Sequence, residues 1–102
     1  MADNSTVDDL TIADEEDGIE TVKELDKKVL TKGGPWVTLM FRYQEWNASK
    51  EEYSDDKFTI RRYQKRDGKY RQKSKFNISS VDQAKSMIEI LQGWTTGEGN
   101  HD

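Results

Sequence analysis

The sequence predicts an α+β fold in which antiparallel strands precede one C-terminal helix. Apolar and polar residues alternate from Trp36 to Trp46, which is typical of a strand with one buried face. Two further alternating runs, 57–64 and 70–78, flank an Asp-Gly dipeptide that favours a tight hairpin turn. From Ser80 onward the apolar residues follow helical spacing instead. A chain of 102 residues has room for one small domain.

Residues 19–31 are compatible with two structures. Their apolar residues fit one face of a helix loosely, whereas Val29 and Leu30 could end a strand. The Gly-Gly-Pro sequence at 33–35 then predicts a turn before the next strand.

The strand over 36–46 is predicted to have two different faces. One face carries Val37, Leu39, Phe41 and Tyr43. The other carries Trp36, Thr38, Met40, Arg42, Gln44 and Trp46. Residues 47–56 are polar and are predicted to form a loop.

The predicted hairpin around Asp67 and Gly68 is rich in bases. Its first strand places Phe58 and Ile60 on one face and Thr59, Arg61 and Tyr63 on the other. Its return strand places Lys69, Arg71, Lys73, Lys75 and Asn77 on one face. Four bases on the same side of a sheet repel one another unless something anionic lies beside them.

A helix is predicted after Ser80, which is an N-cap residue type. Gln83 stands at the capping-box position and Asp82 lies in the first turn, where negative charge is favourable. The apolar stripe consists of Val81, Ala84, Ile88 and Leu91, with Met87 beside it. Gly93 is expected to end this helix.

The net charge of −4 conceals two regions of opposite sign. Residues 1–20 hold eight acids and no base, whereas residues 57–75 hold nine bases and one acid. Residues 1–18 are predicted to be a disordered acidic arm, 19–94 the single folded domain and 95–102 a second disordered tail. The arm is either a solubilising tail or a polyanion mimic that folds back on the basic face and competes with DNA.

Several classes of function are disfavoured by composition. The chain has no cysteine, so disulfides and thiolate metal sites are excluded. No apolar run is long enough to span a membrane and the N-terminus is acidic, so a cytoplasmic protein is expected, nucleoid-associated if bacterial. The only histidine, His101, lies in the predicted tail, and the acids at 14–17 do not match a calcium loop. We expect no enzyme activity, metal or cofactor.

The basic hairpin is interleaved with aromatic residues. Such a surface can stack bases on flat rings while ammonium and guanidinium groups contact phosphates. Trp36, Arg42 and Trp46 could extend it from the preceding strand. The alternative is that the aromatic rings are core or dimer packing and the bases are ordinary solvated strand residues.

Short motifs in this region resemble the transcriptional positive cofactor four family, in its short bacterial form. A Trp-bearing strand from Trp36 to Asn47 precedes them, and the likeness covers roughly residues 21–93. The motifs are Ile60-Arg61-Arg62-Tyr63, Asp67-Gly68-Lys69, Lys73-Ser74-Lys75 and Asn77-Ile78-Ser79, followed by Ser80 and Gln83. Two departures are Gln64, where an aromatic often follows the tyrosine, and Arg71-Gln72-Lys73 in place of Pro-Gly. A third is that Phe76 and Ile78 are one residue out of phase with the usual Ile-Ser-Leu apolar positions.

The resemblance implies a curved four-stranded antiparallel sheet with one C-terminal helix, a homodimer, and binding of single-stranded DNA. RNA is a second expected ligand and the transcription machinery a further partner, with low sequence specificity. A protein-interaction adaptor that uses the arm or the basic sheet is the alternative. The register of the last strand stays open. The predicted nucleic-acid-binding residues are Arg61, Tyr63, Lys65, Lys69, Arg71, Lys73, Lys75, Trp36, Arg42 and Trp46.

Overall fold

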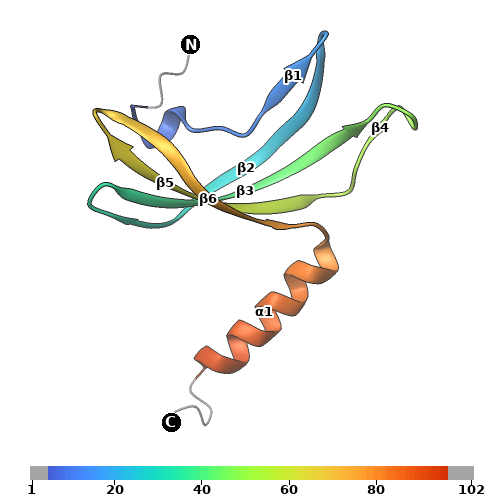
Figure 1. Ribbon diagram of the computed structural model, residues 1–102. Helices are drawn as coiled ribbons and strands as arrows, with labels where there is room; N and C mark the ends of the chain where they lie inside the picture. Colours follow the sequence, from blue (N-terminus) through green and yellow to red (C-terminus); the bar gives the residue numbers. More distant parts are fainter. Residues whose placement is uncertain (1–4, 97–102) are drawn as a thin grey trace.

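The computed structural model describes residues 5–96 as one antiparallel sheet with a short 3-10 helix before it and an α-helix after it (Figure 1). The sheet order is β1-β2-β3-β5-β6, and β4 pairs with the end of β3. The elements are η1 (Val7–Asp9), β1 (Asp14–Glu16), β2 (Ile19–Gly33), β3 (Trp36–Asn47), β4 (Glu52–Tyr53), β5 (Lys57–Arg66), β6 (Lys69–Ile78) and α1 (Val81–Thr95).

The predicted α+β class is confirmed, but the predicted number of four strands is too low. The additional strands are β1, within the predicted arm, and β4, within the predicted loop at 47–56. Both are short strands, of three and two residues, beside hairpin turns. Runs this short carry too little alternation to identify a strand from sequence.

The segment that fitted either helix or strand is the long strand β2. It pairs with β3 from Val22 opposite Glu45 to Gly33 opposite Trp36. The register shifts twice, so that Leu25 and Leu30 are extra residues opposite the regular partners on β3. Because each bulge interrupts the period of two, the apolar residues of β2 imitate a loose helical pattern.

Two Asp-Gly turns close hairpins in this sheet. Asp67 and Gly68 have φ angles of 53° and 79° between β5 and β6, which confirms the predicted turn. Asp17 and Gly18 have φ angles of 51° and 81° between β1 and β2. Positive φ at both central residues gives a type I′ twist that matches the twist of the strands.

The predicted disorder of the arm needs correction over residues 5–18. Val7, Leu10 and Ile12 join the core cluster, and Leu10 is only 2% exposed. Residues 5–13, which we call the strap, lie on the side toward which the ends of the sheet curl, and α1 lies on the other side (Figure 1). Burial of these three apolar side chains stabilises the folded arm. The low average hydrophobicity of residues 1–18 concealed this contribution. Residues 1–4 and 97–102 of the predicted tails lie outside the described residues.

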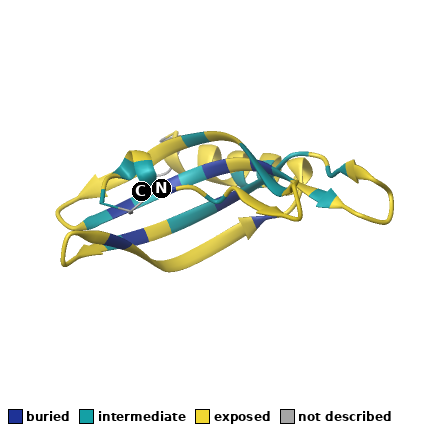
Figure 2. Cartoon of the chain, turned by 90° about the horizontal axis from the view of Figure 1, so that it is seen from above, coloured by how far each residue is buried: buried dark blue, intermediate teal, exposed yellow. Residues whose placement is uncertain are grey.

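The core lies beneath the strap, in the middle of the sheet. The predicted inner face of β3, from Val37 to Tyr43, is buried as expected. Thr59, Tyr63 and Tyr70 of the β5–β6 hairpin complete it. In Figure 2 the buried segments lie on the neighbouring central strands, whereas the hairpin tips are exposed.

Helix α1 starts where the sequence predicts and ends later. Ser80 accepts a hydrogen bond from the Gln83 N–H at 3.0 Å, and the Gln83 side chain accepts one from the Ser79 N–H at 3.1 Å. The helix continues past Gly93 to Thr95, so the predicted glycine end is wrong. The Thr96 N–H still bonds to the Gln92 carbonyl at 3.0 Å. Within the described residues, no helix is both long and apolar enough to cross a membrane.

Candidate nucleic-acid interface

The two faces of the sheet divide the predicted binding residues. Directly opposed residues on neighbouring strands share a face. Tyr63 opposes Val37, so Arg61 and Tyr63 lie on the face beneath the strap, which we call the strap face. Trp36 and Arg42 oppose Gln64 and Phe58 on the helix-side face. The predicted single surface joining these residues is therefore wrong.

The four bases of β6 also do not share one face. Pairing with β5 jumps from Ser74 to Gln72, which makes Lys73 the extra residue of a bulge. Lys75 opposes Arg61 on the strap face, whereas Arg71 opposes Gln64 on the helix-side face. The bulge settles the open register of this strand and separates bases that would otherwise repel one another.

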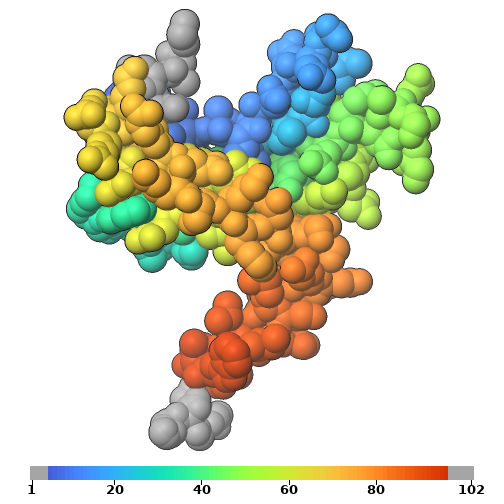
Figure 3. Space-filling model, viewed as in Figure 1, coloured from blue at the N-terminus to red at the C-terminus, as the bar shows by residue number. Residues whose placement is uncertain are grey.

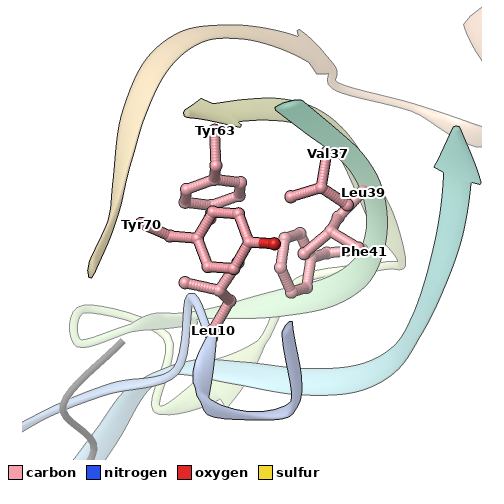
Figure 4. Close-up of a cluster of buried hydrophobic side chains, with 6 residues drawn as sticks. All are labelled: Leu10, Val37, Leu39, Phe41, Tyr63 and Tyr70. Carbon is pink, nitrogen blue, oxygen red and sulfur yellow. The ribbon is translucent and has the colours of Figure 1, made fainter. Parts of the chain in front are cut away.

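Tyr63 belongs to the core rather than to an exposed surface. It is 6% exposed and lies in a cluster with Leu10 and Tyr70 (Figure 4). Burial raises the pKa of the Tyr63 hydroxyl, because the charged phenolate would lose its hydration. With the strap in place, the ring cannot stack on a base.

Arg61 is held within a polar network of the strap face. Its Nε donates to the Thr59 hydroxyl at 3.1 Å and its Nη1 donates to the Gln72 side-chain carbonyl at 2.9 Å. Thr59 in turn lies 2.7 Å from the Asn77 side-chain oxygen. These bonds fix the guanidinium beside Lys75, which is exposed.

Most of the remaining predicted bases gather at one end of the sheet. The β2–β3 turn and the β5–β6 turn lie there together, joined by a 2.7 Å bond from the Lys65 N–H to the Pro35 carbonyl (Figure 1). Residues 31–37 and 62–73 contain seven bases and one acid, Asp67. We call this the basic end; its bases are Lys32, Arg62, Lys65, Arg66, Lys69, Arg71 and Lys73.

Aromatic rings of the basic end lie against cations. The Arg62 guanidinium carbon lies 3.8 Å from the centroid of the Trp36 ring, and Lys65 Nζ lies 5.4 Å from that of Tyr70. Trp36 is half-buried, so the residue keeps part of its surface in contact with solvent. Lys32, Arg62 and Arg66 were not among the predicted binding residues. For Arg62, the evidence is that it pairs with β3 on the face that carries Trp36, and this pairing is known only from the structure.

The other end of the sheet is acidic. Residues 14–20 and 45–56, at the β1–β2 turn and around β4, contain ten acids and one base. Arg42 forms a 3.3 Å ion pair with Asp56 there, and the Trp46 ring meets Tyr53 edge-on at 5.1 Å. Trp46 is therefore separated from the basic end by most of the length of β3 and Arg42 by about half of it, against the prediction.

Residues 5–96 contain no group of three His, Asp or Glu side chains that could hold a metal ion. Comparisons with models of protein families, with curated proteins and with solved structures found no match. The resemblance to positive cofactor four therefore stays a prediction from short motifs.

Proposed function

We propose that this protein binds single-stranded DNA or RNA through the basic end, with little base specificity. The observation that carries the proposal is the concentration of seven bases against one acid in the two turn regions at the end of the sheet where Trp36 lies half-buried. Arg62, Arg66 and Lys69 share the face of Trp36, whereas Lys32 and Lys65 lie on the strap face. Cations supply contacts to phosphates, and an aromatic ring supplies a stacking platform that accepts any base.

The positions of the bases suit a strand that passes around the end of the sheet. Arg66 and Lys69 oppose each other at the tip of the β5–β6 hairpin, and both are exposed. Arg62 lies farther along the same face, over Trp36. A backbone held at the tip would bring a base to the Trp36 ring, either beside Arg62 or in its place.

The acidic end supports one orientation of binding. Because ten acids repel a phosphate backbone, the field of the protein directs a polyanion toward the opposite end. Residues 5–96 thus form a dipolar body rather than a uniformly charged one. The chain's net negative charge is compatible with nucleic-acid binding for this reason.

A pair of charge-matched variants tests the proposal. We expect Arg66→Gln/Lys69→Gln to weaken binding of a fluorescent oligo-dT, measured by anisotropy over a salt series. If each side chain neutralises one phosphate, the log–log salt slope should become shallower by about 1.4. The control Lys50→Gln/Lys85→Gln removes two exposed bases outside the basic end and should leave the slope unchanged.

Duplex DNA of equal length, in the same assay, should bind more weakly than the single strand because its bases are not free to stack. Equal salt slopes for the two double variants would contradict the proposed site. Absence of binding to any oligonucleotide at low salt would contradict the function and favour the adaptor alternative.

We also propose that the protein acts as a homodimer that covers α1. None of the helix's residues Val81–Thr95 is buried, and Ile88 and Leu91 are 60% and 52% exposed. The helix projects from the sheet in Figure 3. On the helix-side face of the sheet, Met40, Ile60 and Phe76 oppose one another on three adjacent strands. Apolar surfaces of this kind mark protein–protein contacts, and a second copy supplies both surfaces.

Light scattering after gel filtration tests the dimer. We expect the mass of two chains for the native protein and of one chain for Ile88→Glu/Leu91→Glu, because buried charges without partners prevent association. Ser86→Glu, which changes the side of α1 opposite Ile88 and Leu91, should stay dimeric. A native protein with the mass of one chain would refute the dimer.

A further inference from the structure

The strap covers the strap face with one apolar anchor. Leu10 lies among Phe41, Tyr63 and Tyr70, so its side chain closes the space between strands β3, β5 and β6 (Figure 4). Val7 and Ile12 pack at the edges of the same cluster. Within residues 5–13, only Val7–Asp9 form a regular element. The strap is therefore held by side-chain contacts rather than by pairing in the sheet.

Two charged residues of β2 bind the backbone of the strap. Lys27 Nζ donates to the carbonyls of Val7 at 2.9 Å and Leu10 at 2.7 Å. The Glu24 carboxylate accepts from the Thr11 hydroxyl at 2.6 Å and from the Ile12 N–H at 3.2 Å. The Thr11–Glu24 bond is exposed and the other three are partly buried, so the attachment consists of a few bonds to two charged side chains rather than a backbone ladder.

The strap also brings acids to the bases of the proposed binding site. Beside it lies a pocket lined by Thr6, Val7 and Asp8 of the strap and by Lys32, Lys65 and Tyr70 of the sheet. The segment thus combines a carboxylate near the basic end with an apolar side chain over aromatic rings. A single-stranded nucleic acid offers the same two kinds of group: its phosphates correspond to the carboxylate, and its bases correspond to the apolar side chain over the rings.

We propose that the strap is a displaceable cover that competes with single-stranded nucleic acid for the strap face. When the strap leaves, Tyr63, Tyr70 and Phe41 become available for stacking, and the Lys27 ammonium is free to bind a phosphate. This inference rests on the proposed function, because it concerns how the same protein regulates access to a second part of its binding surface.

Competition of this kind has a measurable size. Apparent affinity equals intrinsic affinity multiplied by the open fraction, so an open fraction of about 10% implies about a tenfold gain on full release. The gain applies to oligonucleotides long enough to reach from the basic end onto the strap face.

Thr11→Glu tests the proposal without deleting any of the core. The new carboxylate would meet Glu24, which now accepts a 2.6 Å bond from Thr11, and the repulsion should release the strap. We expect tighter binding of oligo-dT, up to about tenfold, although the added negative charge alone would weaken binding. Ala13→Glu is the matched control: it adds the same charge at an exposed position and should bind no more tightly than the native protein.

Hydrogen exchange on the native chain tests the release directly. The Leu10 N–H bonds to the Val7 carbonyl at 3.1 Å and should be protected in the free protein. Saturating oligo-dT should remove this protection if nucleic acid displaces the strap. Leu10→Asp, which places a charge at the anchor, is a second way to open the strap should Thr11→Glu stay closed.

The outcomes separate the two proposals. A native protein that binds no oligonucleotide refutes the proposed function. A native protein that binds oligo-dT with Leu10 still protected overturns the competition and leaves the function intact. A variant shown by exchange to be open, yet with native affinity, overturns it equally.

Discussion

Phe41→Ala is expected to lower the free energy of unfolding by about 3–5 kcal/mol, because a large buried aromatic side chain is replaced by a cavity. Phe41 is fully buried at the centre of β3, between Lys27 of β2 and Thr59 of β5. Small domains have only about 5–15 kcal/mol of stability in total. Urea unfolding followed by circular dichroism would show a lower midpoint with an unchanged slope.

Ile19→Ala serves as the comparison for this loss. Ile19 begins β2 at the β1–β2 turn and is 41% exposed, so its truncation removes much less buried surface than that of the fully buried Phe41. We expect its midpoint to lie close to that of the native chain. If the two variants lost equal stability, the core would not be centred on β3 as described.

Trp36→Ala is expected to weaken binding of a single-stranded oligonucleotide by roughly 5- to 150-fold, which corresponds to about 1–3 kcal/mol for one stacked base. Trp36 lies at the basic end, with Arg62 3.8 Å from its ring centroid. Removing the ring removes both the platform for a base and the contact that positions this guanidinium. Anisotropy of a labelled oligo-dT measures the loss.

Trp46→Ala is the control for this prediction. Trp46 lies on the same strand but at the acidic end, edge-on to Tyr53. Its loss should change affinity little, because phosphates are repelled from that end. Equal losses for the two tryptophans would refute the assignment of binding to the basic end and return Trp46 to the candidate site.

Local signals account for the parts of the fold that were predicted correctly. The alternation of β3, the turn at Asp67 and Gly68, and the Ser80 cap each depend on residues within a few positions of one another. The turn at Asp17 and Gly18 carries the same dipeptide, and its signal was present in the sequence. The acidic composition around it led to a prediction of disorder instead.

The candidate site was predicted only in part, for reasons of register. The sequence contained the basic hairpin, and the structure keeps Lys65, Lys69 and Arg71 at the same end of the sheet as Trp36, with Lys69 and Arg71 on its face and Lys65 on the strap face. In the structure, Tyr63 is instead buried beneath Leu10, on the face away from Lys69 and Arg71. Trp46 lies at the acidic end.

The sequence by itself determined the secondary structure of β3, β5, β6 and the start of α1, and the split of charge between the first twenty residues and the hairpin. These follow from local periodicity and turn chemistry. Only the tertiary structure decided which faces β3 and β5 share, where the bulge at Lys73 falls, and that Leu10 fills the core. A one-residue change in register reverses a strand's faces, and the energy that selects the register comes from contacts between residues far apart in the chain.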